Sequence, residues 1–405
     1  MRRATDVMAQ RGLAREDPIR LLIVGAGVAG VAVARLLRAR GLHPLVVERA
    51  GPGGDGGYML GLMPFVDPVL REIGVHDRYL ESSVGMHRYR LHGASGRVLK
   101  EYSLDEAIGR FGHYRGIERG QLLGLLGIEA IPVAYRTTLT GLHQEADRVH
   151  VTLAEQGKRL DLEFDAVIAA DGLHSATRSL LLDPGQVHSY DTGWGGWVAW
   201  THADTHTDDG CGAYEEIWGA GSFIGLYPVR DRIGVFVGGP HDATAEGPAA
   251  FAERVRRTLR TLDGRCARAL RAVADTPDAY YWNMSDVRAS PWTTGRVALL
   301  GDAAAGFLPT AGVGAAMAME SAAVLAEELG ATGAASIPRA LSTYERTQRP
   351  RVETAQNNSR RLARLMFQRG RLITGARDVV TRFVGVNTAL GPIRTLLEQR
   401  PPSMP

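Results

Sequence analysis

The sequence predicts an α/β fold in which a mostly parallel sheet is interrupted by a mixed or antiparallel sheet and followed by C-terminal helices. Three observations support this. Short apolar runs at 19–24, 164–170 and 296–300 each stop at a glycine or Asp-Gly turn, as is typical of buried parallel strands. The stretch 186–284 instead has short alternating runs rich in aromatic residues, which indicates a separate sheet. Beyond residue 344 the pattern is helical and arginine-rich.

The length of 405 residues exceeds what one ordinary hydrophobic core supports, so we expect two interleaved domains. The remaining boundaries follow from where the patterns change. The predicted segments are a disordered N-terminus (1–18), a discontinuous parallel-sheet domain (19–84, 105–185 and 285–345), an inserted β-sheet domain (85–104 and 186–284) and a C-terminal helical segment (346–405).

The first elements form one strand–helix–strand unit. Residues 19–24 predict a strand, 31–40 a helix that Gly41 ends, and 44–48 the next strand, placed beside the first by a right-handed crossover. The later elements are read in the same way. They are hairpins at 89–102 and 148–162, strands at 164–170 and 296–300, and a strong helix at 315–329.

Composition excludes several classes of function. The net charge of +3 gives no case for nucleic acid as a partner. Cys211 and Cys266 are too few for a disulfide framework, and no cysteine or histidine cluster predicts a metal site. Residues 1–18 lack the apolar core of a signal peptide, and no apolar stretch is long enough to span a bilayer. We therefore expect a cytoplasmic protein that is a monomer or homodimer.

The glycine motif at residues 25–30 follows the first strand and opens the helix. Gly25 permits a tight turn, Gly27 lets the backbone approach a pyrophosphate, and Gly30 lets helix and strand pack closely. Glu48 ends the second strand, where a carboxylate binds ribose hydroxyls and repels a 2′-phosphate. The motif predicts FAD or NAD, with a ligand-free glycine turn as the alternative. The predicted contacts are Gly25, Gly27, Val28, Ala29, Gly30, Glu48 and Arg49.

Two later loops favour FAD over NAD. Asp171-Gly172 and Gly301-Asp302 each follow a buried strand, so their carboxylates lie at the edge of the sheet where ligands bind. Asp302 can hold the ribityl hydroxyls of a flavin, and the loop 309–314 can bring backbone N–H groups toward its pyrimidine ring. The predicted contacts here are Asp171, Gly301, Asp302, Gly312, Val313, Gly314 and Ala315.

These motifs, in this order, resemble the group A flavoprotein monooxygenases, the para-hydroxybenzoate hydroxylase-like family, over roughly residues 19–351. The resemblance implies a Rossmann-like FAD-binding domain, FAD as cofactor and NADH or NADPH as transient reductant. It also implies oxygen transfer from a flavin C4a-hydroperoxide. Arg119 matches an arginine that contacts FAD, and Arg178 lies in the loop that meets the nicotinamide. No catalytic side chain is predicted.

The substrate expected from the aromatic insertion is a large hydrophobic aromatic or polyketide-like natural product. Trp197, Tyr227 and Pro309 are the predicted lining, although the aromatic residues can equally be sheet core. Ala305 and Ala316 stand where the family usually has histidine and asparagine. These departures leave open an alternative, an FAD-bound cyclase that closes a carbon ring without net redox. A flavin-bound carrier or sensor is a third interpretation.

Overall fold

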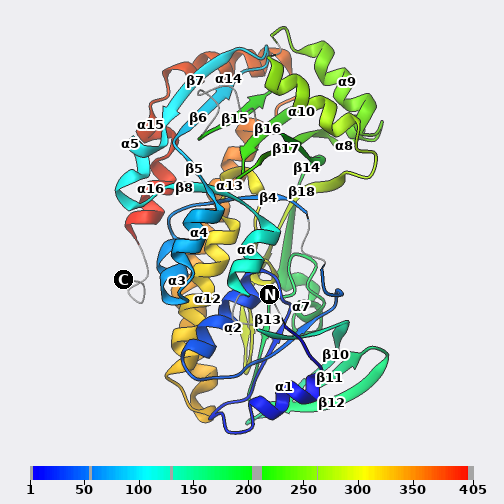
Figure 1. Ribbon diagram of the computed structural model, residues 1–405, viewed down its shortest axis with the longest axis vertical. Coiled ribbons are helices and arrows are strands. Elements are labelled where there is room, and N and C mark those ends of the chain that lie inside the picture. Colours follow the sequence, from blue (N-terminus) through cyan, green and yellow to red (C-terminus); the bar gives the residue numbers. More distant parts are fainter. Residues whose placement is uncertain (1–2, 54–56, 128–130, 203–211, 262, 400–405) are drawn as a thin grey trace.

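The computed structural model describes residues 3–53, 57–127, 131–202, 212–261 and 263–399. The molecule is elongated, with a parallel-sheet domain at one end and an inserted-sheet domain at the other (Figure 1). This arrangement confirms the predicted α/β fold with an inserted sheet and C-terminal helices.

The parallel-sheet domain is built on seven strands. In spatial order they are β1 (Arg3–Ala4), β9 (Pro132–Tyr135), β3 (Leu45–Glu48), β2 (Leu21–Val24), β13 (Ala166–Ala169), β20 (Val297–Leu299) and β19 (Thr293–Thr294). All neighbours pair in parallel except β19 with β20. Ile168 in β13 pairs with Ile23 on one side and Ala298 on the other, so the three apolar runs read from the sequence form adjacent strands.

Helices and a small sheet cover the two faces of these strands. Helices α2 (Val28–Ala39) and α12 (Gly314–Gly330) pack on one face and against each other. An antiparallel sheet packs on the other face, which explains why the strands are apolar on both sides. It consists of β10 (Thr137–Gln144), β11 (Val149–Glu155) and β12 (Lys158–Phe164).

The expectation that residues 1–18 are disordered is wrong for the part that the structure describes. Strand β1 extends the parallel sheet, and helix α1 (Val7–Leu13) follows it. The side chain of Gln10 is buried and exchanges two hydrogen bonds with the backbone of Val46 (3.1 and 2.8 Å). Asp6 caps the helix through the backbone N–H of Ala9 (2.7 Å). The polar composition of residues 1–18 suggested disorder, but here the polar side chains of Asp6 and Gln10 make the hydrogen bonds that hold the segment in place.

The inserted-sheet domain has a seven-stranded sheet of its own. In spatial order its strands are β18 (Tyr280–Ala289), β14 (Val187–His202), β17 (Arg232–Pro240), β16 (Phe223–Pro228), β15 (Ala213–Trp218), β6 (Arg88–His92) and β7 (Val98–Ser103). A smaller antiparallel sheet joins the two domains. Its strands are β4 (Met59–Leu62), β8 (Tyr114–Glu118) and β5 (Val84–Met86).

Helices cover the outer face of the inserted sheet, which the sequence analysis treated as sheet alone. They are α8 (His241–Thr244), α9 (Pro248–Thr258) and α10 (Gly264–Ala274). On α10, Cys266, Ala269, Leu270 and Val273 are buried with helical spacing against the sheet. Cys266 is a free, buried thiol, whereas Cys211 lies outside the described residues.

Shorter elements connect these layers. They are α3 (Val66–Glu72), α4 (His76–Ser82), α5 (Leu104–Ile108), α6 (Arg119–Leu126), α7 (Ala176–Leu181), α11 (Asp302–Ala305), η1 (Gly109–Phe111), η2 (Pro184–Gln186), η3 (Pro309–Ala311) and η4 (Ala334–Ser336).

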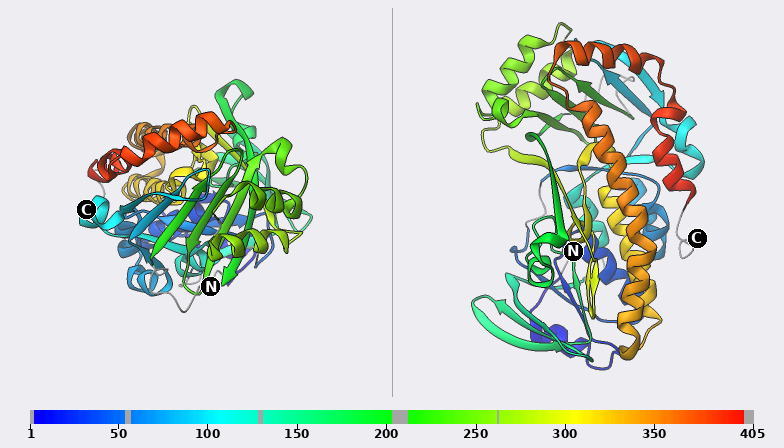
Figure 2. Two further views of the ribbon diagram at one scale, coloured as in Figure 1. Left: turned by 90° about the horizontal axis from the view of Figure 1, so that it is seen from above. Right: turned by 180° about the vertical axis from the view of Figure 1, so that it is seen from behind.

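A long helix, α13 (Ile337–Met366), runs along the molecule between the two domains (Figure 2). The predicted boundary between 345 and 346 falls inside this helix, and that between 284 and 285 falls inside β18. Helix α13 and strand β18 therefore each run from one domain into the other. The chain ends in α14 (Arg371–Phe383), α15 (Val386–Ala389) and α16 (Gly391–Glu398). Among the described helices, none is both long and apolar enough to cross a membrane.

Candidate active site

A first cavity, of about 260 Å³, opens at the carboxyl ends of β2, β3 and β13. Gly25 turns there with a φ of +105°, and a Cβ on it would lie 2.3 Å from the carbonyl oxygen of Ala170. A Cβ on Gly30 would lie 1.9 Å from the carbonyl oxygen of Gly25, so helix α2 starts this close to the strand only with glycine present. Around Gly27 the space is open.

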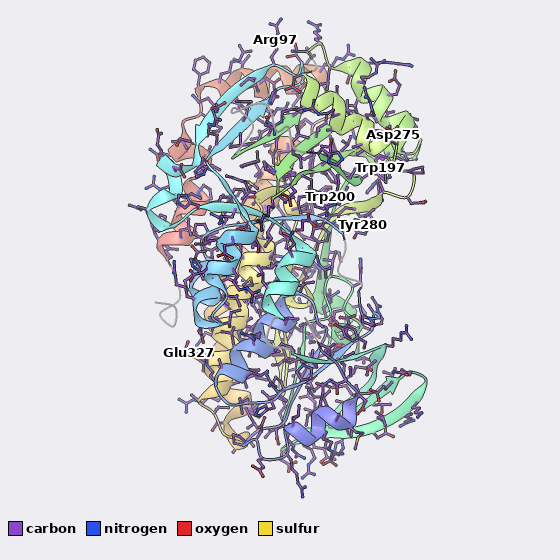
Figure 3. The ribbon with its side chains drawn as sticks, in the orientation of Figure 1. Arg97, Trp197, Trp200, Asp275, Tyr280 and Glu327 are labelled. Carbon is purple, nitrogen blue, oxygen red and sulfur yellow. The ribbon has the colours of Figure 1, made fainter. Side chains whose placement is uncertain are left out.

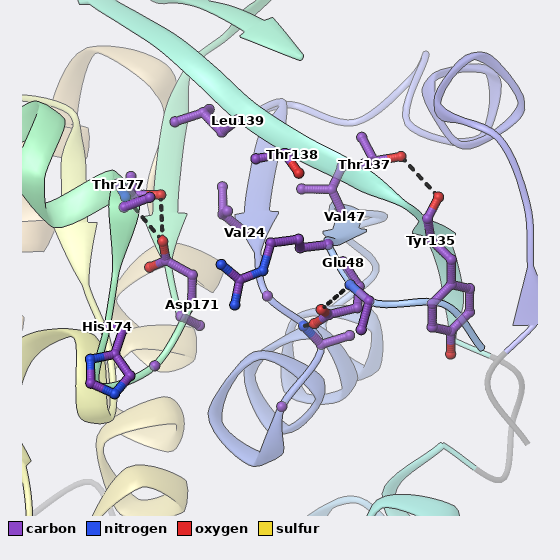
Figure 4. Close-up of a pocket in the computed structure, with 18 of the residues that line it drawn as sticks. Val24, Val47, Glu48, Tyr135, Thr137, Thr138, Leu139, Asp171, His174 and Thr177 are labelled. Carbon is purple, nitrogen blue, oxygen red and sulfur yellow. Dashed lines mark hydrogen bonds between the residues drawn. The ribbon is translucent and has the colours of Figure 1, made fainter. Parts of the chain in front are cut away.

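Glu48 lies at the rim of this cavity, across from Asp171 and His174 (Figure 4). Its Oε2 accepts a hydrogen bond from the backbone N–H of Ala26 (2.9 Å), and its Oε1 accepts one from Ala50 (2.8 Å). These two bonds fix the carboxylate beside the glycine turn. Arg49 also lines the cavity.

The loop after β13 is held by Asp171. Its carboxylate accepts hydrogen bonds from the backbone N–H (3.0 Å) and hydroxyl (2.9 Å) of Thr177 and from the hydroxyl of Ser175. The same loop places His174 in contact with the first cavity and with a second, larger one. Sequence reasoning did not select His174, although it lies within the motif that was recognised.

Arg178 does not reach either cavity, contrary to the expectation that it meets the nicotinamide. Its buried guanidinium donates to the carbonyl oxygens of Ala303 (3.0 Å) and Leu173 (2.8 Å). Burial lowers the pKa of this arginine, and the nearby Asp171 partly offsets the effect. The side chain therefore ties the loop after β13 to α11.

The second cavity, of about 410 Å³, lies between the parallel-sheet domain and the inserted sheet. Both cavities touch the start of α2 and of α6, and they share Gly27, Arg119, Ala170, Gly172 and His174. The two together therefore form one elongated space that bends around the N-terminal end of α2.

Asp302 and Arg119 provide the charges in the second cavity. The Asp302 carboxyl is exposed to the cavity space but enclosed by protein, and this desolvation raises its pKa to about 6, partly offset by Arg119. The guanidinium of Arg119 lies 5.8 Å from the ring centroid of Tyr58. Glu118, which directly precedes Arg119 in the chain, forms a bidentate ion pair with Arg232 of the inserted sheet (2.6 and 2.7 Å).

The loop between α11 and α12 contributes backbone to the second cavity. Gly312 has a φ of +60°, and a Cβ there would lie 2.6 Å from the hydroxyl oxygen of Tyr114. Gly312, Gly314 and Ala315 line the cavity at the N-terminal end of α12, where helix N–H groups are unpaired. Val313 is buried and does not line it.

Two other predicted residues, Gly30 and Gly301, have structural positions. Gly30 packs against Gly25, and Gly301 turns into α11 with a φ of +62°, its Cβ position 2.8 Å from the Cβ of Ala29. Neither lines the two larger cavities. Ala316, where the family usually has asparagine, is fully buried behind Ala315.

The inserted sheet turns an apolar aromatic face to the second cavity. That lining consists of Phe223, Tyr227, Phe236, Tyr280, Trp282 and Met284, joined by Met366 at the end of α13, Phe367 directly after it, Pro309 and Tyr58. Tyr227 and Pro309 were predicted. On β18 the lining residues Tyr280, Trp282 and Met284 occur at every second position, so alternation could have revealed these three once one of them was placed.

Trp197 is wrong as a predicted lining residue. It lies on β14, where Val198 pairs with Phe236 and Trp197 with Val237 (Figure 3). Since Phe236 faces the cavity, Trp197 points to the opposite face. There it packs against Phe251, with ring centroids 5.8 Å apart, under helix α9.

A buried carboxylate, Glu216, lies behind the aromatic lining. It accepts hydrogen bonds from the hydroxyls of Tyr227 (3.0 Å) and Tyr89 (2.7 Å) and from the indole N–H of Trp218 (3.0 Å). Burial raises its pKa, and the three hydrogen bonds act against that rise. Glu216 is not among the site residues predicted from the sequence.

The residues present fit an extended flavin dinucleotide. A backbone cradle opens at Gly27, an acidic rim at Glu48 lies on one side, and a larger space with Asp302 lies on the other. The aromatic face then leaves room for a second ring compound beside the start of α12. Fold and site together are those of the flavin-dependent monooxygenases of the para-hydroxybenzoate hydroxylase-like type.

Comparison with known proteins gives the family. The family model described as FAD binding domain matches residues 19–359, and the chain belongs to this family. A flavin-dependent monooxygenase of Legionella longbeachae is 28% identical over 351 residues, covering 84% of this chain and 87% of the relative. The 6-hydroxynicotinate 3-monooxygenase of Pseudomonas fluorescens is 29% identical over 357 residues, covering 84% and 90%.

Solved structures share the fold. Klebsiella pneumoniae HpxO complexed with FAD and uric acid has a TM-score of 0.82 at 23% identity, covering 96% of this chain and 99% of that one. A salicylate hydroxylase substrate complex has a TM-score of 0.73 at 19% identity, covering 95% and 99%. FAD is therefore the cofactor of this chain, and the chain is a flavoprotein of the monooxygenase class.

Proposed function

We propose that this enzyme uses NADH or NADPH to reduce its FAD and then inserts one oxygen atom into a flat, largely apolar aromatic substrate of the polyketide-like class. The observation that carries the proposal is the position of the second cavity. It joins Asp302 and the start of α12 on one side to the aromatic face of the inserted sheet on the other.

In this proposal the first cavity holds the adenosine and pyrophosphate. The N–H groups at Gly27 and Val28 meet the phosphates, and Glu48 accepts from the ribose. Asp302 holds the ribityl chain. The N–H groups from Gly312 to Ala315 face the flavin ring and favour negative charge on it.

The bound FAD supplies hydride acceptance and oxygen activation, and this chain supplies position and exclusion of water. Phe223, Phe236 and Trp282 offer flat apolar surface without charge. Tyr227 offers a hydroxyl whose proton is committed to Glu216, so its oxygen is left to accept from a substrate O–H. The balanced reaction consumes O₂, NAD(P)H and a proton and yields hydroxylated product, NAD(P)⁺ and water.

The relatives support an aromatic substrate without identifying it. One is named for 6-hydroxynicotinate, and one solved structure holds uric acid. Both compounds are small and polar. The apolar lining here favours a larger and less polar ring system, which is why we propose a polyketide-like compound.

Rapid anaerobic mixing of the holoprotein with NADH or NADPH tests the proposal. Flavin absorbance is followed with and without candidate aromatic substrates, and the product is analysed after admission of ¹⁸O₂. We expect substrate to accelerate bleaching and one ¹⁸O atom to enter the product. Flavin that stays oxidised through turnover, with a product of unchanged mass, would instead establish the ring-closing cyclase that Ala305 and Ala316 favour.

A further inference from the structure

Helix α14 is amphipathic with its apolar side turned to solvent. Its exposed large apolar residues are Leu372 (90% exposed), Ile373 (59%), Val379 (56%), Val380 (62%) and Phe383 (84%). Their spacing places them on one side of the helix, and we call this set the α14 stripe. An exposed stripe of this kind marks an interaction surface more often than a chance feature.

The opposite, polar side of α14 is what attaches the helix to the protein. Thr374, Arg377 and Thr381 are buried. The guanidinium of Arg377 donates to the carbonyl oxygens of Trp218 and Met366 (3.3 Å for the latter) and lies 5.6 Å from the Trp218 ring centroid. These contacts leave the helix little freedom to rotate, so the stripe cannot turn inward.

Neighbouring segments add further anchors. The carboxylate of Asp378 accepts from the backbone N–H of Ala94 (2.8 Å) and pairs with Arg377 (2.8 Å). At the other end, the hydroxyl of Tyr102 donates to the carbonyl oxygen of Val384 (3.2 Å). The one acidic side chain of α14 is thereby neutralised on the inner side.

The charge around the stripe is positive. Arg371 and Arg382 are exposed at its two ends, and within the described residues neither is paired with a carboxylate. Lys100 of β7 lies beside the helix, donating to the carbonyl oxygen of Arg382 (3.4 Å). Figures 1 and 2 show α14 at the end of the molecule that lies away from the parallel-sheet domain.

We propose that the α14 stripe docks on the surface of an anionic lipid bilayer. A ridge of apolar side chains flanked by arginines is the arrangement of helices that lie in a membrane interface. A second copy of this chain is a less suitable partner for the α14 stripe. Two α14 helices packed across a two-fold axis would bring arginine toward arginine in either direction. The proposal does not depend on the reaction proposed above.

Docking would also place the substrate cavity near the membrane. Met366 and Phe367 line that cavity, and α14 begins four positions after Phe367. The ring of Phe367 stacks on Trp194 with centroids 4.8 Å apart. An apolar substrate dissolved in the bilayer would then meet the protein at the end where its cavity is closed by these side chains.

Flotation of the holoprotein with lipid vesicles tests the proposal. The vesicles are phosphatidylcholine alone or with about one third phosphatidylglycerol, at low and high salt. We expect flotation with the anionic vesicles, weakened by salt. The double variant Leu372→Ser/Phe383→Ser should weaken it by about tenfold or more, since each side chain loses most of its burial in lipid.

Helix α1, at the opposite end of the molecule, supplies matched controls. Met8→Ser/Leu13→Ser removes two apolar side chains that are about half exposed (53% and 54%), and Arg11→Gln/Arg15→Gln removes two exposed arginines. Neither control should change flotation, whereas Arg371→Gln/Arg382→Gln should weaken it on anionic vesicles. FAD absorbance confirms that each variant is folded.

Two results would overturn the proposal. One is an absence of flotation by the wild-type holoprotein, or equal flotation by the Leu372→Ser/Phe383→Ser variant. The other comes from analytical ultracentrifugation. If the wild type is a dimer that this variant converts to a monomer, and vesicles do not bind, the α14 stripe is an interface between copies.

Discussion

The hydroxyl of Tyr227 donates a hydrogen bond to Oε1 of the buried Glu216 at 3.0 Å. This contact links a residue of the cavity lining to a carboxylate that substrate cannot reach. Tyr227 is thereby held in one orientation, with its hydroxyl proton committed to Glu216. Glu216 is a positioning residue in this arrangement.

Replacing Glu216 with Leu should weaken substrate binding while FAD stays bound. The change leaves the hydroxyl of Tyr227 without its acceptor, and the buried hydroxyl of Tyr89 and indole of Trp218 lose theirs. We expect KM to rise and stability to fall by about 1–3 kcal/mol for the unpaired donors. Tyr227→Phe is the matched variant, because it removes only the hydroxyl that donates to Glu216. A KM unchanged in both variants would contradict the positioning role.

Asp302→Ala should give protein with little bound FAD. The side chain is the carboxylate of the second cavity, and without it the ribityl hydroxyls have no charged acceptor there. The ratio of flavin absorbance to protein absorbance after gel filtration measures the effect. Glu327→Ala, an exposed change on α12, is the control. Full flavin retention in Asp302→Ala would contradict the assignment of Asp302 as the residue that binds the ribityl chain.

The free energy of unfolding of the flavin-free protein should decrease as the pH rises from about 4 to about 6, because Asp302 loses its proton over this range. Its pKa is raised by desolvation to about 6 from 3.8, so the folded chain holds this proton more tightly than the unfolded chain. The stabilisation is complete below the unfolded pKa and is lost as pH rises through the folded one. Urea unfolding at several pH values should show this slope in the wild type, and Asp302→Asn should lack it.

Arg360→Leu should destabilise the protein strongly. Its guanidinium donates to both carboxylate oxygens of Asp286 (2.6 and 2.8 Å), which is fully buried. Removing the cation leaves a buried charge uncompensated, at a cost of about 3 kcal/mol or more. Chemical denaturation measures this cost, with Arg257→Leu on the exposed side of α9 as the control. Equal stability of the two variants would show that the pair contributes little.

Much of the parallel-sheet domain could be predicted because its signals are local. Each central strand is apolar throughout, and Gly25 and Gly30 are required by contacts with atoms of neighbouring turns. Helix α10 was not predicted, although Cys266, Ala269, Leu270 and Val273 have helical spacing. The aromatic residues that alternate on both sides of this segment are typical of strands, and the whole region was predicted as sheet.

The predictions that were wrong concern residues whose surroundings are set by tertiary packing and not by the neighbouring sequence. Alternation on β14 separates Trp197 from Val198 but does not say which face meets the cavity. Arg178 is occupied by backbone carbonyls of Ala303 and Leu173, whose approach is set by tertiary packing. In α14 the side that packs against the protein is the polar one, which the amphipathic sequence alone does not reveal.

Helix α13 makes the two sheets parts of one rigid frame. Near its start, the hydroxyl of Tyr344 donates to the carbonyl oxygen of Leu299 in the parallel sheet (3.1 Å). Just past its end, Phe367 stacks on Trp194 of the inserted sheet. A strut of 30 residues, about 45 Å long, bends most easily at Pro350, where one backbone hydrogen bond is missing. We therefore expect α13 to hold the width of the second cavity nearly constant, so that a substrate enters by displacing side chains rather than by moving the two domains apart.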